Sequence, residues 1–207
     1  MTAPSVFLVD DDFAVRDSLS LFFKTVGIPV ECFHSAESFL DECSQYWKGC
    51  LILDVRMPGK SGLNLQEELI RRGMRMPVIF ITGYGDVPTT VQAMKNGAIE
   101  FMIKPINMAE LLDHVQSAIE FSNSQQRAGE KRDALQKRLS TLTLRESEIL
   151  SLAIVGVSNK EIAQRLGISH RTVETHRSRV LVKTGVKNIL ELTRFVVDAD
   201  SFIEKIP

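Results

Sequence analysis

Reactive side chains stand directly after four short apolar runs in the first half of the chain. They are Asp10, Asp11, Asp54, Thr82 and Lys104, which follow the runs 6–9, 50–53, 78–81 and 101–103. Carboxylates that lie close together repel one another, and a divalent cation relieves that repulsion. Mg²⁺ prefers oxygen ligands and also binds phosphate oxygens. Carboxylates combined with a hydroxyl and an ammonium group therefore predict a phosphoryl site, in which the protein mainly positions the transferred group.

The apolar runs must be arranged so that these side chains meet. Together with a weaker run at 30–33, they have the length of strands and mostly lack alternation, as expected for strands covered on both faces. Helical patterns lie between them, for example an apolar face that includes Leu19 and Phe23, and a helix start at Asp86 and Pro88. Five strands alternating with five helices predict a doubly wound parallel sheet. In such sheets the site lies at the carboxyl ends of the strands.

Each reactive position also has a plainer explanation. Acidic residues after a strand often cap the next helix, and a Lys-Pro pair is common in turns. Phe101, taken alone, is explained equally well as a core residue and as a residue that moves when the site reacts. The phosphoryl site is favoured because four features of this kind occur at successive strand ends.

Composition is that of an ordinary globular protein. Hydrophobic residues make up 44% of the 207 residues and charged residues 25%. No apolar run is long enough to span a bilayer, and the first residues lack the basic segment of a signal peptide. The three cysteines form no CxxC motif, which favours reduced thiols in the cytoplasm. We therefore expect a cytoplasmic protein with no membrane partner.

Charge differs between the two halves of the chain. Residues 1–120 carry 10 Lys and Arg against 16 Asp and Glu, a net charge of −6, whereas residues 121–207 carry 15 against 10, a net charge of +5. An acidic half followed by a basic half predicts two domains with different partners. The basic half is a candidate for nucleic-acid binding, although a chance imbalance of surface charge would look the same.

The C-terminal half has the pattern of a small all-helical domain. Two capping boxes, Thr143 with Glu146 and Ser158 with Glu161, predict two helix starts. Ser169 caps a third helix that reaches about residue 184, and a fourth helix is expected over 188–197. Residues 158–184 therefore predict a helix-turn-helix. The segment 121–140 before this domain predicts an exposed helical linker, and a disordered linker is the alternative.

The helix 169–184 combines an apolar face with a basic, hydroxyl-bearing face. Val173, Val180 and Leu181 share the apolar side. The opposite side carries Arg171, Thr175, Ser178, Arg179 and Val182, with Glu174 at its margin. Such a face suits a helix that enters the major groove of DNA, where Arg grips guanine or phosphate and Glu accepts from cytosine. The alternative is the solvated face of an ordinary helical bundle.

Four segments carry a family resemblance over residues 1–120. The segments FLVDDD, LILDVRMPGKSG, FITGYGD and FMIKPIN resemble the receiver domain of two-component response regulators, which has a flavodoxin-like α/β fold. The resemblance implies that a sensor histidine kinase phosphorylates Asp54, and that Thr82 and Lys104 contact the acyl phosphate. It implies that Mg²⁺ is held by Asp10, Asp11, Asp54 and the backbone carbonyl of Arg56. It also implies that Phe101 is a switch aromatic and that the peptide bond from Lys104 to Pro105 is cis.

A second resemblance covers residues 141–197. The segments LTLRESEIL, GVSNKEIAQRLGISHRTVETH and VLVKTGV resemble the LuxR/FixJ-type helix-turn-helix, here a four-helix domain. By position, Glu174, Thr175 and Ser178 are the expected base readers. The expected phosphate contacts are Asn159, Lys160, Arg171, Thr172 and Arg179. His176 and Arg177 are ranked lower because they lie nearer the packed side of the helix.

Together these expectations describe a FixJ/NarL-type response regulator with a receiver at 1–120, a linker at 121–140 and a DNA-binding domain at 141–207. Phosphorylation is expected to promote homodimerisation and promoter binding, most simply as an activator acting with RNA polymerase. The chain is then no enzyme beyond its own Mg²⁺-dependent phosphorylation and slow dephosphorylation.

Two alternatives stay open. One is a haloacid-dehalogenase-type phosphatase that reacts through Asp10, opposed by Ala14 where that motif has Thr or Val. The other is a DNA-binding protein whose receiver fold only dimerises. Arg56 and Tyr84 are further expected to border the phosphoryl site and to tune the lifetime of the phosphate.

Overall fold

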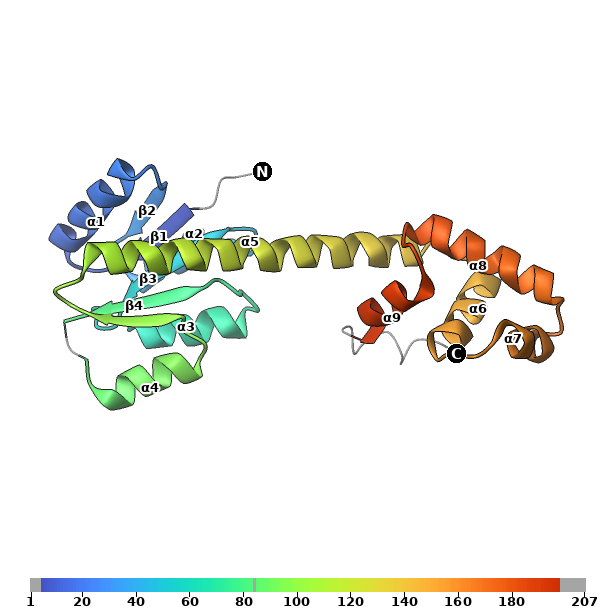
Figure 1. Cartoon of the computed structure of the whole chain (residues 1–207). Coiled ribbons are helices and arrows are strands. Elements are labelled where there is room, and N and C mark those ends of the chain that lie inside the picture. The colour runs from blue at the N-terminus through green and yellow to red at the C-terminus, as the bar shows by residue number, and fades with distance from the viewer. Residues whose placement is uncertain (1–4, 84, 198–207) are drawn as a thin grey trace. The chain divides into compact units, whose positions relative to one another are not determined.

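The structure is a computed structural model of the 207-residue chain and describes residues 5–83 and 85–197. The chain divides into two compact units, 1–127 and 128–207. Figure 1 labels most of their helices and strands. The expected role of Tyr84 falls outside the described residues.

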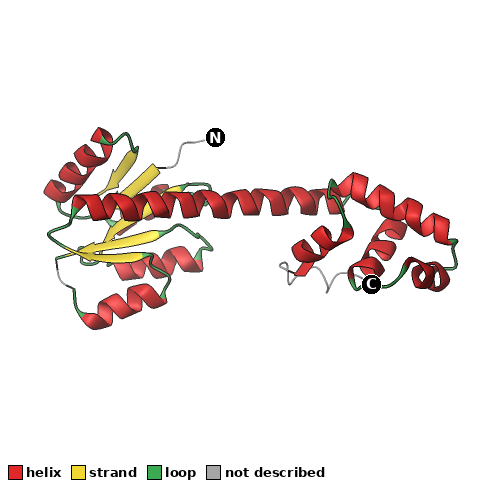
Figure 2. Ribbon diagram, in the orientation of Figure 1, coloured by secondary structure: helices red, strands yellow, loops and turns green. Residues whose placement is uncertain are grey.

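The first unit is a parallel α/β sheet, as the sequence predicts (Figure 2). Its strands are β1 (Ser5–Val9), β2 (Val30–Phe33), β3 (Gly49–Asp54), β4 (Val78–Thr82) and β5 (Glu100–Ile103). Its helices are α1 (Phe13–Thr25), α2 (Ala36–Glu42), α3 (Gly62–Arg71), α4 (Val87–Lys95) and the first part of α5 (Met108–Leu139). The strands follow the order β2-β1-β3-β4-β5, and every neighbouring pair is parallel.

Two apolar layers cover the sheet because successive side chains of a strand point to opposite faces. Phe7 and Leu53 belong to the layer that packs under α2, α3 and α4. Leu8 and Ile52 belong to the layer that packs under α1 and α5. The described side chains of β3 and β4 and residues 6–9 of β1 are all buried, which explains why these strands read as unalternated apolar runs, whereas the edge strands β2 and β5 are partly exposed.

Helix starts near the sheet edge are fixed by side-chain caps. The Asp86 carboxylate accepts a hydrogen bond from the Thr89 amide at 2.8 Å, and Pro88 lies in the first turn of α4, as the sequence predicts. Asn107 Oδ1 accepts from the Ala109 amide at 3.1 Å at the start of α5. These caps set where each helix leaves the carboxyl edge of the sheet.

Helix α5 continues past the first unit. It runs without interruption from Met108 to Leu139 and contains Gly129, a residue that weakens a helix by about 1 kcal/mol relative to Ala. Its residues from 128 onward belong to the second unit, where Leu135 is buried against Leu150, Val180 and Leu192. The limits 1–120, 121–140 and 141–207 stay a prediction.

The second unit is all-helical. Besides the end of α5 it contains α6 (Leu144–Ile154), α7 (Asn159–Leu166), α8 (His170–Thr184) and α9 (Ile189–Val197). Both predicted capping boxes form, because Thr143 pairs with Glu146 and Ser158 with Glu161. Gly167 ends α7 with φ +64°, a left-handed conformation that glycine adopts without steric cost, so that α8 starts after a short turn.

Candidate functional site

The predicted reactive side chains of the first unit meet at the carboxyl edge of the sheet. Asp10 follows β1, and Asp54 and Thr82 end β3 and β4; all three are buried, with exposed fractions of 1%, 5% and 1%. The Lys104 amide donates to the Thr82 carbonyl at 2.7 Å, which fixes Lys104 beside the end of β4. The peptide bond from Lys104 to Pro105 is cis, as expected.

The Lys104 ammonium group lies between the two buried carboxylates. Its Nζ is 2.7 Å from Asp10 Oδ2 and 3.0 Å from Asp54 Oδ1. The second oxygen of each carboxylate accepts a backbone hydrogen bond, from Asp12 to Asp10 at 2.8 Å and from Arg56 to Asp54 at 2.7 Å. Arg16 also donates to the Asp10 carbonyl at 2.6 Å. The site is thus held from four segments of the chain.

Burial and charge act against each other at this site. Burial raises the pKa of Asp54 and the nearby Asp10 carboxylate adds to the rise, whereas Lys104 and the Arg56 amide oppose it. Burial alone would lower the pKa of Lys104, but its hydrogen bonds to Asp10 and Asp54 raise it overall. One ammonium group faces two carboxylates, so the cluster keeps an excess of negative charge.

The donor chemistry of the cluster fits Mg²⁺. Asp10 and Asp54 supply buried carboxylate oxygens, Asp11 is exposed beside them, and the excess negative charge favours a divalent cation. Among residues 5–83 and 85–197, however, no group of three or more His, Cys, Asp or Glu side chains is arranged to hold a metal ion. In this arrangement Lys104 contacts both of the carboxylates that would be ligands.

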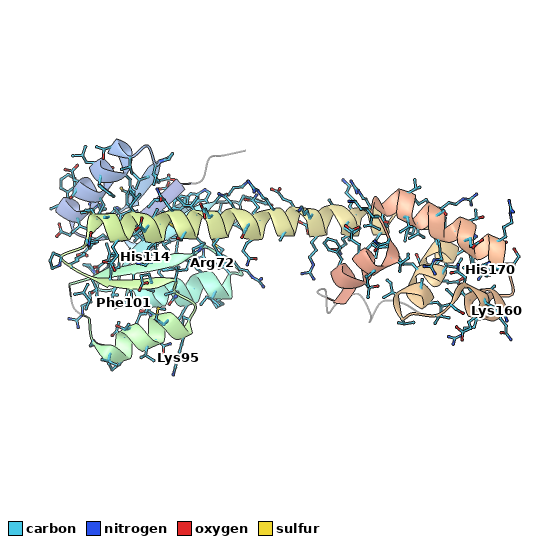
Figure 3. All side chains as sticks on the ribbon, in the orientation of Figure 1. Arg72, Lys95, Phe101, His114, Lys160 and His170 are labelled. Carbon is cyan, nitrogen blue, oxygen red and sulfur yellow. The ribbon has the colours of Figure 1, made fainter. Side chains whose placement is uncertain are left out.

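The expected switch aromatic, Phe101, lies next to the edge of the site. Phe101, which Figure 3 labels, is half-buried. Its ring centroid is 6.1 Å from that of Phe80 in β4. A Cβ at Gly85, which precedes α4, would lie 2.6 Å from Cδ1 of Ile103, an exposed side chain that can move, and 3.8 Å from Phe101 Cε1. Gly85 therefore lies close to both Phe101 and Ile103.

Sequence patterns missed a contact that positions the loop after Asp54. Glu37 at the start of α2 accepts a hydrogen bond from the Lys60 amide at 3.0 Å, and its carboxyl group lies against Gly59. These two bonding residues are 23 positions apart, and no local motif marks the pair.

The second unit exposes the predicted polar face of α8. Val173 and Val180 are buried and Leu181 is half-buried, whereas Arg171, Glu174, Thr175, Ser178 and Arg179 are exposed. An open hollow of about 450 Å³ lies along this face, lined by Thr175, Ser178, Arg179, Val182 and Lys183. Figure 3 labels Lys160 on α7 and His170 in the first turn of α8, both of which are exposed.

Two of the predicted DNA contacts already have protein partners. Asn159 is half-buried, and its Oδ1 accepts a hydrogen bond from Arg177 Nη1 at 2.6 Å. Thr172 is also half-buried, with its hydroxyl 2.8 Å from that of Ser169. These two residues hold the turn between α7 and α8, whereas Lys160 and Arg171 are exposed.

The C-terminal end of α8 is held by contacts that sequence patterns also missed. Lys183 Nζ donates to the buried Glu146 carboxylate at 2.6 Å, and Arg138 Nη1 donates to the Thr184 carbonyl at 3.1 Å. The Lys183 ammonium and the Thr143 amide keep the pKa of Glu146 below its ordinary value. A single carboxylate thus caps α6 and also fixes α8.

Both units match known families. Residues 6–116 match the family described as response regulator receiver domain, and residues 140–196 match bacterial regulatory proteins of the luxR family. The chain is 43% identical over 202 residues to transcriptional regulatory protein TdiR of Thauera aromatica, covering 96% of this chain and 88% of that protein. It is 42% identical over 192 residues to transcriptional regulatory protein FixJ of Azorhizobium caulinodans, covering 93% and 91%.

A solved structure has the same architecture over nearly the whole chain. The structure of response regulator StyR matches with a TM-score of 0.82 and 42% identity, covering 95% of this chain and all of that one. A parallel receiver sheet joined to a LuxR-type helical domain defines a DNA-binding response regulator of a two-component system. This chain belongs to the NarL/FixJ-type response regulators and is a regulator of transcription.

Within the described residues, no helix is both long and apolar enough to cross a membrane.

Proposed function

We propose that Asp54 is the phosphoacceptor of this regulator and that a sensor histidine kinase supplies the phosphoryl group. The observation that carries the proposal is the position of Lys104, whose ammonium group bridges Asp54 and Asp10 at the carboxyl edge of a parallel sheet. A receiver domain implies a histidine kinase as partner. Asp54 is the carboxylate at the end of a central strand, with β1 on one side and β4 on the other.

The transfer forms a bond between a carboxylate oxygen of Asp54 and phosphorus. The bond from phosphorus to the leaving group of the donor breaks, and the leaving group departs with the electron pair. Lys104 and Thr82 stabilise the charge that gathers on the phosphoryl oxygens, and the Arg56 amide holds Asp54 in place. Mg²⁺, held by Asp10, Asp11, Asp54 and the Arg56 carbonyl, would supply further neutralisation of that charge. Slow hydrolysis of the same acyl phosphate returns the resting form.

The phosphoryl group changes the resting contacts of the site. It adds negative charge and acceptor oxygens, so Lys104 exchanges a carboxylate contact for a phosphate contact, and the Thr82 hydroxyl is drawn toward the phosphate. Phe101 moves inward into the space that Thr82 leaves. The loop from Gly83 and helix α4 are bracketed by Thr82 and Phe101, and they report the change to the surface.

The exposed face of α8 reads promoter DNA. Glu174, Thr175 and Ser178 face the base edges, while Lys160, Arg171 and Arg179 neutralise phosphates, so binding falls steeply with salt. Asn159 and Thr172 contribute mainly by holding the turn before α8, because their side chains already bind Arg177 and Ser169.

Phosphorylation acts through dimerisation. A small helical domain gains affinity when two copies occupy paired half-sites, so a phosphorylated homodimer binds the promoter more tightly than the resting chain does. We propose that the bound dimer acts as an activator by contacting RNA polymerase. This function places the protein in the cytoplasm, where it has access to the histidine kinase domain, the polymerase and the promoter.

Chemical phosphorylation tests this function directly. The full chain is incubated with Mg²⁺ and acetyl phosphate, and the modified residue is located by mass spectrometry after hydroxylamine treatment, which cleaves acyl phosphates. We expect a hydroxylamine-sensitive adduct on Asp54, together with tighter promoter binding. The Asp54→Asn variant should show neither effect while it keeps its resting affinity for DNA.

Other outcomes contradict the proposal in different ways. An adduct on Asp10 that turns over rapidly would identify a phosphatase. The absence of any adduct, with DNA binding and dimerisation intact, would identify a receiver fold that serves only in assembly.

A further inference from the structure

The amide of Gln66 is a polar group buried inside the receiver, and the chemistry proposed for Asp54 does not use it. Gln66 lies on α3 and is 2% exposed. A buried polar side chain costs free energy unless it is hydrogen-bonded. Its Nε2 donates to the Ala93 carbonyl at 3.2 Å and to the Asn96 carbonyl at 3.4 Å. These bonds join α3 to the C-terminal end of α4, which packs on the same face of the sheet (Figure 1).

The two bonds meet a need that every helix end creates. The last carbonyl groups of a helix have no donor within the helix and are satisfied by other groups. The Ala93 carbonyl accepts from the Ala98 amide at 3.0 Å as the chain turns toward β5, and Gln66 supplies a second donor. The carbonyl of Asn96, the C-cap residue, also accepts from Gln66. An amide nitrogen carries two N–H donors, so one side chain can serve both carbonyls.

Apolar packing holds α4 only weakly. Of its residues 87–95, all of which the structure describes, only Ala93 is buried, and its side chain is a single methyl group. The larger apolar side chains of α4 stay exposed, Val87 at 75% and Met94 at 44%. A helix that buries so little apolar surface gains little stability from packing, and such elements move most readily. The Ala93 methyl group and the bonds from Gln66 both act at the C-terminal end of α4.

The N-terminal end of α4 is attached differently. The Asp86 carboxylate caps it by accepting from the Thr89 amide, a contact within one segment that does not join α4 to the sheet. This end follows β4, the strand that Thr82 ends. A change at Thr82 therefore reaches the N-terminal end of α4 before it reaches the end that Gln66 holds.

We propose that Gln66 is a positioning residue that keeps the C-terminal end of α4 in place, so that α4 turns about this end when Asp54 is phosphorylated. The proposal rests on the function proposed above for Asp54 and adds the residue that determines how α4 responds. Movement of Thr82 toward the phosphate displaces the N-terminal end, while the two bonds from Gln66 hold the other end against α3. A small movement at Thr82 thus rotates the exposed face of α4 without loosening the whole helix.

Gln66→Met is the variant that removes these bonds. Methionine has a similar length, suits a buried position and has no N–H donor. In hydrogen-exchange NMR of the ¹⁵N-labelled resting chain, the Ala98 amide should exchange about tenfold faster than in wild type, because its acceptor Ala93 is held less firmly. The Leu53 amide in β3 should keep its rate. The control Gln92→Met makes the same change at an exposed position of α4 and should alter neither rate.

Acetyl phosphate tests the response of the same variants. The dissociation constant of the full-chain dimer is measured by sedimentation equilibrium in Mg²⁺, with and without acetyl phosphate. The factor by which acetyl phosphate lowers this constant should be about fivefold smaller in Gln66→Met than in wild type, because a loosened α4 passes on less of the change. The rate of adduct formation on Asp54 should stay the same, since Asp54 and Lys104 are untouched. A merely structural role would lower the rate and the response together.

Three results would overturn the proposal. Unchanged exchange at Ala98 would show that Gln66 does not hold α4. Faster exchange with an unchanged response to acetyl phosphate would show a contact that only stabilises α4. Slower adduct formation in Gln66→Met would show a general loss of receiver structure. A wild-type chain that forms no adduct, or forms it without dimerising, would instead contradict the proposed function, and the exchange at Ala98 would then decide by itself whether Gln66 holds α4.

Discussion

The two functional regions of this regulator are built in opposite ways. At the proposed phosphoryl site, Asp10 and Asp54 are almost fully buried, and Lys104 contacts both. On the face of α8 that is proposed to bind DNA, the polar side chains are exposed, and even the apolar Val182 is 82% exposed. The first region is a cluster of buried charges at the sheet edge, whereas the second is a row of exposed side chains on one face of a helix.

The difference follows from what each region must recognise. A phosphoryl group is small, and its transfer requires charged groups that are already in position. These groups are therefore held in place at the sheet edge although burying them costs free energy. DNA is a large, hydrated partner whose phosphates give most of the affinity. Exposed basic side chains can bind these phosphates without being buried in the free protein. A single substitution at the first region should therefore change the rate of phosphorylation strongly. A single substitution at the second region should change the affinity for DNA by a smaller factor.

The largest expected effect tests the cluster of buried charges. Lys104→Met removes the charge that stabilises the transferred group and should slow adduct formation with acetyl phosphate about 100-fold. The rate is measured from the hydroxylamine-sensitive adduct. Lys95→Met on the exposed face of α4 removes the same charge elsewhere and should leave the rate unchanged. Equal rates in the two variants would mean that Lys104 is only a structural counter-ion.

The next effect tests the exposed face of α8. Arg179→Ala should weaken binding about tenfold for all DNA sequences alike and reduce the salt dependence of the affinity by about one counterion. Fluorescence anisotropy at several salt concentrations measures both quantities. Arg132→Ala, an equal loss of charge at an exposed position of α5, is the control and should have little effect. A loss confined to one DNA sequence would instead make Arg179 a base reader.

A smaller effect tests the contact that holds the C-terminal end of α8. Glu146→Gln weakens the bond to Lys183 and should destabilise the second unit by about 1 kcal/mol. Because the pKa of Glu146 is lowered in the folded chain, its contribution is present at neutral pH. That contribution is lost as the pH falls below the ordinary carboxyl value of 4.5, so wild type and variant should converge there.

The chain itself provides a way to separate the two units in that measurement. Its single tryptophan, Trp47, stacks on Phe7 in the receiver with ring centroids 4.4 Å apart. Tryptophan fluorescence therefore follows the receiver, while far-ultraviolet circular dichroism follows the helices of both units. A shift of the fluorescence transition in Glu146→Gln would contradict the assignment to the second unit.

The smallest expected effect is a gain in stability. Burial raises the pKa of Asp54, so keeping it ionised costs stability at neutral pH, and this cost disappears as the pH falls toward the ordinary value of 3.8. Asp54→Asn should therefore stabilise the receiver by about 0.5 kcal/mol at pH 7, with less gain near pH 4. Urea unfolding followed by Trp47 fluorescence measures the difference. A loss of stability at pH 7 would show that the bond to Lys104 outweighs the burial.

Local patterns predicted most of the fold. The strand-length apolar runs, the caps at Asp86 and Thr143, and the end of α8 before Gly185 all depend on residues close in sequence. The acidic cluster was predictable too, because a parallel sheet brings the ends of its strands to one edge.

Contacts set by tertiary packing were not predictable in this way. Glu37 and Lys60 meet across 23 positions, and Lys183 and Glu146 across 37, with no motif to pair them. The family resemblance makes Asn159 an expected phosphate contact, but no sequence pattern shows that Arg177, 18 residues further on, donates to its side-chain oxygen. Such partners depend on how helices pack, which single residues do not reveal.

The strand order carries a consequence for how the chain folds as it is made. β1 is synthesised first yet lies between β2 and β3, and the last strand, β5, ends at residue 103. The sheet is therefore complete only late in synthesis, and its strands pair across long connections. The helical unit uses mostly nearby contacts and should form sooner once its residues have emerged. In refolding from urea we therefore expect helical ellipticity to return ahead of Trp47 fluorescence, with the slow step in the sheet.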